Sequence, residues 1–422
     1  MVTRRKFLQG SAGLITLSGT GITLGLTPNR FNAQGDRTFV YLFFRGGMDG
    51  LNLLVPRTGT NRQQYEAKRP NIQIPLNRLL PLNNNWGIPD TCTELRDLYV
   101  GGNLAMIHAV GMPAGLGSRS HFDSMAMYEY GTPGNTSAFS GWIARHMLSA
   151  FNIPNDSVFP SLVPGNPPTS MQGDPSVTSV EDPSNYHPNP GRYGDNHIRT
   201  LRELHSGETT LDAAVQNTMD TVGIVNELDL SIPDFYPNTS LAQDLGLIAQ
   251  VIKSDLGVQV ASVDFGGWDT HENSGDNGNG YFTDRLGTIS EAVGAFFQDL
   301  EAAGRMDQVT LATQTDFGRR VRENGNKGTD HGTGQVMMVA GGAVNGGQIY
   351  GTFPGITDDD LYLNTDLEAT TDFRLPLMDI MKNFMGNPQV NEIFPGYTGG
   401  TSLGLFPEKV FLPDNIFANG FD

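Results

Sequence analysis

The sequence predicts an α/β fold in which a largely parallel central sheet is sandwiched between helices and joined by long loops. Several short apolar runs, each long enough for a buried strand, end in polar and glycine-rich segments. Stretches with helical spacing separate some of these runs, and this alternation is typical of a parallel sheet covered by helices. A chain of 422 residues, with 38% hydrophobic and 17% charged residues, can also bury the large core that such a fold needs.

The individual elements follow from the apolar runs in chain order. The predicted strands are residues 38–44, 104–110, 258–265, 309–313 and 336–341. The predicted helices are residues 241–256, residues 282–303 and a shorter helix that ends at Gly131. Residues 164–192 are crowded with Pro, Asn, Ser, Gly and Asp, which predicts a long loop. We therefore expect one domain over residues 36–400, with a loop-rich insertion or cap at residues 151–240.

The two ends of the chain are predicted to lie outside that domain. Residues 1–35 have the pattern of a twin-arginine signal peptide, because Arg4 and Arg5 precede a weakly apolar stretch. A basic N-terminal arm on a cytosolic protein is the alternative. The signal predicts an exported protein, in the periplasm, at the cell surface or secreted, with the twin-arginine translocation machinery as a partner. After it, no stretch reaches the ~20 apolar residues of a membrane span. Residues 401–422 are a C-terminal tail, either a sorting tag or a frayed terminus.

Charge and cysteine content exclude two classes of protein. The formal charge of −18 argues against a nucleic-acid-binding protein, because the phosphates of a nucleic acid would be repelled. It is compatible with binding of divalent cations, although an acidic solvated surface is the commoner cause. The single cysteine, Cys92, rules out an intrachain disulfide and a C-x-x-C zinc site.

Carboxylate and imidazole side chains follow the ends of several predicted strands. The carboxyl ends of parallel strands meet at one edge of a sheet, where open α/β sheets bind their ligands. Carboxylates and imidazoles are metal ligands, so we predict a site for a divalent cation, with Zn, Mn, Ca and Mg as candidates. For Asp49 taken alone a structural role in a turn is favoured, whereas for Asp269, which could also be a turn residue, the neighbouring His271 favours a ligand role. The metal ligands predicted from strand-end placement are Asp269, His271, Asp316, Asp330 and His331.

A second set of candidate residues lies in the stretch SRSHFD at residues 118–123. We expect a helix to begin here, and its free N–H groups and dipole would stabilise an anion such as phosphate or sulfate. The candidate catalytic residues are Arg119, Ser120 and His121. The structural alternative is a capping box formed by Ser120 and Asp123. Both interpretations can hold together, since a capped helix start can also bind an anion.

A set of motifs in a fixed order resembles the bacterial DUF1501 family. That family has no known function and is grouped with the alkaline-phosphatase and sulfatase-like superfamily. The resemblance extends over roughly residues 37–395, and it implies an alkaline-phosphatase-like core with a metal-assisted esterase site at the strand ends. The motifs, after the twin-arginine leader, are FFRGGMDGLNLLVP, SRSHFD, GGWDTHEN, TDFGRR and TDHGTG.

The resemblance also implies roles for individual residues. Asp49 matches a metal-ligating Asp after the first strand, and Asp269 with His271 matches the Asp and His of the opposite metal site. Asp316 matches the Asp of the superfamily's Asp-His pair. His331 resembles the late metal-binding His of the superfamily.

Two positions match the superfamily's pattern less directly. Phe317 stands where the His of the Asp-His pair would be, which leaves open a single divalent ion or a site without catalysis. The nucleophile would lie within residues 118–120, where we favour Ser120, and Arg119 is the candidate oxyanion partner.

These observations lead to two hypotheses for the function. The first is an exported, metal-dependent hydrolase of phosphate or sulfate esters, acting on a small molecule or a polymer. The second is a non-catalytic exported binding or cell-surface protein that retains the alkaline-phosphatase-like fold. The Phe317 departure favours the second hypothesis, whereas the Asp-His pairs count against it.

Overall fold

The computed structural model describes most of the predicted domain. Arg4 and Arg5, and residues 409–422 of the tail, lie outside the described residues, and the division into signal peptide, domain and tail stays a prediction. Within the described part of the chain, no helix combines the length and apolar character needed to cross a membrane. The described residues are 15–17, 22–24, 37–150, 153, 157–180, 194–207, 209, 211–212, 215–216, 219 and 228–408.

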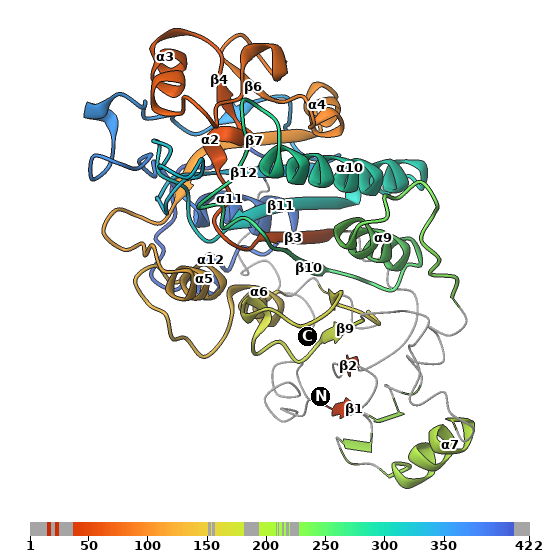
Figure 1. Ribbon diagram of the computed structural model, residues 1–422. Helices are drawn as coiled ribbons and strands as arrows, with labels where there is room; N and C mark the ends of the chain where they lie inside the picture. The colour runs from red at the N-terminus through yellow and green to blue at the C-terminus, as the bar shows by residue number, and fades with distance from the viewer. Residues whose placement is uncertain are drawn as a thin grey trace.

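A nine-stranded sheet forms the centre of the molecule (Figure 1). Its strand order is β13-β7-β12-β11-β3-β10-β8-β9, and β14 also pairs with β7. Only β12 runs antiparallel to its neighbours, so the predicted largely parallel sheet is confirmed. The strands are β3 (Thr38–Phe44), β7 (Leu104–Gly111), β8 (Ser161–Val163), β9 (Val177–Ser179), β10 (Val260–Phe265), β11 (Val309–Thr315), β12 (Gln335–Gly341), β13 (Ile349–Tyr350) and β14 (Thr371–Asp372).

Strand β3 explains why the sheet is covered on both faces. All seven of its residues are buried. Alternate side chains of a strand point to opposite faces, and here Val40 and Leu42 enter one hydrophobic cluster while Phe39 and Tyr41 enter another. A run of large apolar residues without polar alternation is stable only where helices shield both faces from water.

The helices form one layer on each side of the sheet (Figure 1). The apolar side chains of α4 (Thr93–Val100), α9 (Ser240–Lys253) and α10 (Tyr281–Ala302) join the cluster that contains Val40. On the other face, the cluster that contains Phe39 includes side chains of four further helices. These helices are α5 (His121–Tyr130), α6 (Trp142–Ser149), α11 (Arg374–Asp379) and α12 (Val390–Ile393).

Several short elements were not predicted from the sequence. The three-residue strands β8 and β9 lie in the region expected to be a loop-rich insertion or cap, yet they extend the central sheet. Two small antiparallel sheets were also missed. These consist of β1 (Ile15–Leu17) with β2 (Ile22–Leu24), and of β4 (Val55–Pro56), β6 (Trp86–Pro89) and β5 (Leu79–Pro81). The other helices whose bounds lie within the described residues are α2 (Gly50–Leu53), α3 (Gly59–Lys68), α7 (Gly194–Leu204), the single turns 76–78, 169–171, 306–308 and 358–360, and the π-turn 380–384.

The sheet brings the predicted site loops to one edge. Strands β11, β3 and β10 are adjacent and parallel, so the loops that follow them leave the sheet side by side. Strand β12 runs the opposite way, so the loop that precedes it reaches the same edge. Glycines allow these loops to touch: a Cβ at Gly318 would lie 1.9 Å from the Gly334 carbonyl oxygen, and one at Gly46 would lie 2.6 Å from the Asp269 nitrogen.

This close approach generates a stability prediction. Gly318→Ala should lower the free energy of unfolding by about 1–3 kcal/mol, because the new methyl group overlaps a backbone carbonyl that cannot rotate away. Gly325→Ala is the matched control in the same loop, since a Cβ added at Gly325 would meet no atom within 4 Å. Urea unfolding of the two variants measures the difference, and equal stability of both would contradict the described loop contact.

Candidate metal centre

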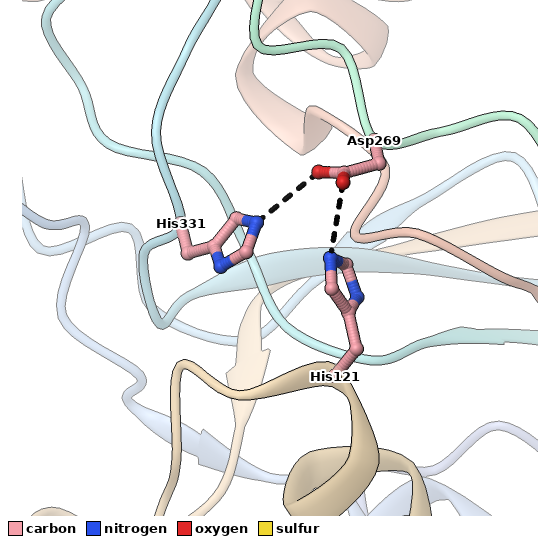
Figure 2. A group of neighbouring side chains, drawn as sticks. All are labelled: His121, Asp269 and His331. Atoms are coloured by element: carbon pink, nitrogen blue, oxygen red, sulfur yellow. Dashed lines mark hydrogen bonds and ion pairs between the residues drawn. The ribbon is translucent and has the colours of Figure 1, made fainter.

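Three side chains from separate loops converge at this edge of the sheet (Figure 2). His121 is the first residue of α5, Asp269 follows β10, and His331 precedes β12. One ligand atom from each residue can be chosen so that all three atoms lie within 4.8 Å of one another. Such a group of two imidazoles and one carboxylate matches the donors that bind divalent transition metals.

The Asp269 carboxylate is the centre of the cluster. Its Oδ1 lies 3.1 Å from Nε2 of His331 and 3.1 Å from Nε2 of His271, and its Oδ2 lies 3.3 Å from Nε2 of His121. Burial alone would raise the pKa of Asp269, but the hydrogen bond from the Arg319 guanidinium and the charge of that group outweigh this effect, and the pKa is lowered to about 2. Asp269 is therefore a carboxylate throughout the neutral pH range.

The other ring nitrogen of each histidine faces an acceptor. In the tautomer whose Nδ1 donates to this acceptor, the Nε2 keeps a lone pair, which is the form that a metal ion binds. Metal-binding histidines in proteins commonly have this arrangement, in which an acceptor fixes the tautomer. The Nδ1 contacts are His121 to Asp316 Oδ2 (2.6 Å), His271 to Asp330 Oδ1 (3.4 Å) and His331 to the Arg119 carbonyl (2.7 Å).

The Nε2 lone pairs consequently point at one another and at a carboxylate. Nε2 of His271 and Nε2 of His331 are 2.8 Å apart, and Nε2 of His121 is buried without a hydrogen-bond partner among the described residues. Lone pairs at such distances repel unless a proton or a cation lies between them. Burial also lowers the pKa of His331, which favours its neutral, metal-binding form.

The donor set therefore fits a divalent cation, with one geometric condition. Two nitrogen ligands of a tetrahedral zinc ion lie about 3.4 Å apart, given Zn–N bonds near 2.1 Å. An ion shared by His271 and His331 would require their rings to separate from the observed 2.8 Å. An ion held by His121, Asp269 and His331 does not require the His271 and His331 rings to separate.

Two of the predicted ligands lie behind the histidines. Asp316 is fully buried, accepts the Gly46 N–H at 3.0 Å and bonds to Nδ1 of His121. Asp330 lies beside Nδ1 of His271 and Asn324. Neither carboxylate belongs to the group that can hold an ion, so in this structure both orient histidines. Direct metal binding by either carboxylate stays a prediction.

Asp49 has a different environment from the one predicted. Its Oδ2 pairs with the buried guanidinium of Arg69 at 2.5 Å, and its Oδ1 accepts the Leu51 N–H at 3.2 Å, which caps α2. Both residues of the pair are almost inaccessible to solvent. Because both oxygens are engaged and Asp49 is outside the cluster of possible ligands, its prediction as a metal ligand is not supported.

Arg319 holds the site loops together, although the sequence predicted no role for it. Its side chain is fully buried and donates a 2.7 Å hydrogen bond to Oδ1 of Asp269. The sequence motif TDFGRR contains Arg319, but nothing in that motif distinguishes a buried arginine from a surface one. The same guanidinium also donates to the main-chain carbonyls of Gly46, Gly47, Trp268 and Thr329.

The predicted catalytic residues are only partly brought to the cluster. His121 joins it, and the Arg119 carbonyl holds His331, whereas the Arg119 guanidinium pairs with buried Asp366 at 2.5 Å. Ser120 is exposed and is the N-cap residue of α5, but its side chain forms no capping hydrogen bond, so the capping box with Asp123 is absent. Among the residues described, the Ser120 hydroxyl forms no hydrogen bond with the cluster.

Phe317 forms an apolar wall of the site. Its ring centroid lies 4.7 Å from that of His121 and 4.3 Å from that of His331, and the side chain is 2% exposed. At this position the chain therefore offers a surface that excludes water from one side of the cluster, where a histidine would offer a further ligand.

Comparisons with known proteins agree with the motif resemblance. Residues 237–389 match the sequence model of a family described as "Protein of unknown function (DUF1501)", which is less than half of the chain. This segment includes the loops with Asp269, Asp316 and His331. Among curated proteins no sequence matches.

Solved structures show only distant likeness. Ps i-CgsB in complex with k-i-k-neocarrahexaose has 8% identity and a TM-score of 0.37, over 74% of this chain and 68% of that chain. The lipoteichoic acid synthase LtaP from Listeria monocytogenes has 10% identity and a TM-score of 0.34, over 90% and 78%. A protein in the alkaline phosphatase superfamily from Vibrio parahaemolyticus has 10% identity and a TM-score of 0.28, over 80% and 68%. At these values the likenesses assign no activity to this chain.

The Asp49–Arg69 pair generates the prediction of this section. Asp49→Asn should lower the free energy of unfolding by about 3–5 kcal/mol, because it leaves the Arg69 charge buried without a counter-charge. The variant should bind as much divalent metal as the wild type. Urea unfolding and elemental analysis measure the two effects. Loss of bound metal with unchanged stability would restore Asp49 as a ligand.

Proposed function

We propose that the protein is an exported, metal-dependent hydrolase of phosphate or sulfate esters. The observation that carries the proposal is the convergence of three histidine Nε2 atoms on the Asp269 carboxylate. Each histidine is anchored through its Nδ1, as expected of metal ligands. The choice of phosphate or sulfate esters rests on the superfamily that the motifs resemble.

The proposed metal ligands are His121, Asp269 and His331, the group whose ligand atoms lie within 4.8 Å of one another. Imidazole donors favour zinc over calcium or magnesium, which prefer oxygen ligands. A bound divalent cation would polarise the ester and lower the pKa of a water molecule. In the hydrolysis, water oxygen adds to phosphorus or sulfur, the bond to the ester oxygen breaks, and that oxygen leaves with a proton.

The residues around this group have complementary tasks. His271 is the most exposed of the three histidines, with 43% of its side chain accessible, and its Nδ1 is held by Asp330. Its Nε2 is therefore placed to accept the proton of the attacking water. The uncapped N-terminus of α5 offers free N–H groups that stabilise negative charge on the substrate.

Metal content and activity test this proposal together. Wild-type protein loaded with zinc and then desalted should retain roughly one ion per chain and hydrolyse p-nitrophenyl phosphate or p-nitrophenyl sulfate. His331→Ala should lose the ion, and its activity should fall on the order of 10²-fold or more. His197→Ala, at an exposed position of α7, is the control and should behave like the wild type.

Asp269→Asn is a second ligand variant, which keeps the test informative if His331→Ala does not fold. Circular dichroism establishes that each variant is folded. The proposal fails if folded wild type and both variants retain equal metal, or if wild type retains none.

The structure also leads to a prediction about the nucleophile. Ser120→Ala should retain activity within about threefold of the wild type, because no described side chain forms a hydrogen bond with the Ser120 hydroxyl that could take its proton. Ser118→Ala is the matched control, since the Ser118 hydroxyl accepts the Ser120 N–H at 3.0 Å. Steady-state kinetics on the better p-nitrophenyl ester measures both. A loss of roughly 10³-fold or more on Ser120→Ala alone would identify Ser120 as a covalent nucleophile.

A non-catalytic binding protein is the second candidate function. The isolation of the Ser120 hydroxyl from the cluster favours it, because a catalytic hydroxyl would lie within reach of the ion. Retention of zinc by the wild type without hydrolysis of either ester would select this candidate.

A further inference from the structure

A cavity of about 320 Å³ lies beside the candidate metal centre and is separate from it. None of the proposed ligands His121, Asp269 and His331 lines this cavity. The Phe317 ring, which packs against both histidines, forms part of its wall. A molecule in the cavity is therefore recognised by the side chains that line it and not by the metal cluster.

Aromatic and apolar side chains make up much of the lining. The rings of Tyr128, Phe317 and Tyr362 border the cavity, together with the side chains of Met112 and Leu363. Small-molecule sites in proteins are commonly lined in this way, and their volumes begin at about 300 Å³. The cavity is therefore large enough for one ring-sized molecule, which would be stabilised by the apolar surface that it buries there.

The charges of the lining do not balance. The Arg119 guanidinium donates two hydrogen bonds, of 3.1 and 2.5 Å, to Oδ2 of the fully buried Asp366, so this pair is neutral as a unit. Glu368 also lines the cavity, at an exposed position, and forms no ion pair with any cation of the described residues. The lining therefore has one uncompensated carboxylate, which attracts a cation and repels an anion.

The free polar groups of the lining are suited to an N–H donor. Among the residues that the structure describes, none forms a hydrogen bond with the Tyr362 hydroxyl or with the Glu368 carboxylate. A phenol oxygen and a carboxylate both accept hydrogen bonds, so the two groups offer acceptors to an ammonium group. The other lining hydroxyls are bonded within the protein: Ser118 to the Ser120 N–H (3.0 Å), Ser124 to a main-chain carbonyl, Thr333 to a main-chain carbonyl (2.7 Å) and Tyr128 to the Gln335 amide (3.2 Å).

The buried side of the cavity also has a negative electrostatic potential. Tyr128 lines this side and is only 1% exposed. Burial raises the pKa of its phenol, the hydrogen bond from Gln335 opposes that effect, and the carboxylates of Asp372 and Asp316 raise the pKa further. The carboxylates that disfavour a phenolate at this position favour a positive group in the adjacent space.

We propose that the cavity binds a small organic cation, an ammonium group attached to an aryl or alkyl group. The apolar part of the ligand packs against Met112, Phe317 and Leu363, and its ammonium group pairs with Glu368. The aromatic rings of the lining add to the attraction, because the face of an aromatic ring is electron-rich. This binding site goes beyond the proposed function and does not depend on it.

Three probes of similar size and different charge test the site. Isothermal titration of the full-length protein at neutral pH should show that benzylamine, which is then a cation, binds about tenfold more tightly than neutral benzyl alcohol. Benzoate, which is an anion, should bind no more tightly than the alcohol, because the uncompensated carboxylate repels it.

The role of Glu368 is tested by a variant of nearly the same size. Glu368→Gln should lower the preference for benzylamine to about threefold or less, because the attraction of the aromatic rings remains while the ion pair is lost. Glu291→Gln, at an exposed position of α10, is the matched control and should keep the tenfold preference. An unchanged preference in Glu368→Gln would overturn the pairing of the ammonium group with Glu368.

The location of the ligand is tested by filling the cavity. Ala114→Trp, which fills the cavity from an exposed loop position, should abolish binding of benzylamine and benzyl alcohol alike. Ala302→Trp, at an exposed position near the end of α10, is the matched control and should bind both probes as the wild type does. Unchanged binding by Ala114→Trp would overturn the assignment of the ligand to this cavity.

Asp269→Asn separates this inference from the proposed function. The variant lacks a proposed metal ligand and should keep the preference for benzylamine, so the cation site is supported even where no ester is hydrolysed and the proposed function fails. Loss of benzylamine binding in folded Asp269→Asn would place the amine at the metal cluster and overturn the cation site. Equal binding of benzylamine and benzyl alcohol, tighter binding of benzoate, or no binding of any probe also overturns it and leaves the proposed function standing.

Discussion

The buried guanidinium of Arg319 is the interaction on which the site depends. A fully buried cation is tolerated only when its donors are satisfied and its charge is balanced, and here the acceptors come from loops after β3 and β10 and from the loop before β12. Each loop is rich in glycine and polar residues, and the buried side chains of Met48 and Trp268 anchor the loops after β3 and β10 in the core. The shared cation fixes them relative to one another, and it sets one oxygen of Asp269 in place beside the histidines. The hydrogen bonds of Arg319 to the surrounding loops thus set the geometry of the site.

The same principle separates the carboxylates by role. Asp49 is neutralised by Arg69 inside the protein, whereas Asp269 shares its oxygens between one arginine and three imidazoles. A carboxylate that a buried arginine already neutralises attracts a metal ion only weakly. A carboxylate that faces histidine lone pairs is stabilised most by a bound ion. Asp316 has an intermediate role, because its carboxylate contacts Nδ1 of His121 and not the Nε2 that faces Asp269. Phe317 then closes one side of the cluster with an aromatic ring, which lowers the access of water to the charges inside.

The sequence was sufficient for the large elements of the fold because their signals are local. Strands β3 and β11 are uninterrupted buried runs, and α10 has a long amphipathic pattern. The placement of Asp269 and His331 at one edge also followed, because parallel strands end together. The choice among carboxylates did not follow, since it depends on which arginine each one meets. Arg69 is 20 residues from Asp49 and Arg319 is 50 residues from Asp269. Pairings of this kind are set by tertiary packing, and strands as short as β8 leave no periodic signal at all.

The location of a bound ion is the sharpest test of whether the Nε2 atoms and Asp269 form a metal centre. Anomalous diffraction at the zinc absorption edge, from crystals of the zinc-loaded protein, would locate it. We expect one strong peak within coordination distance of Nε2 of His331 and a carboxylate oxygen of Asp269, with Asp49 still paired to Arg69. A peak bound to Asp49 with Arg69 displaced, or no peak at this edge of the sheet, would contradict the metal centre described above.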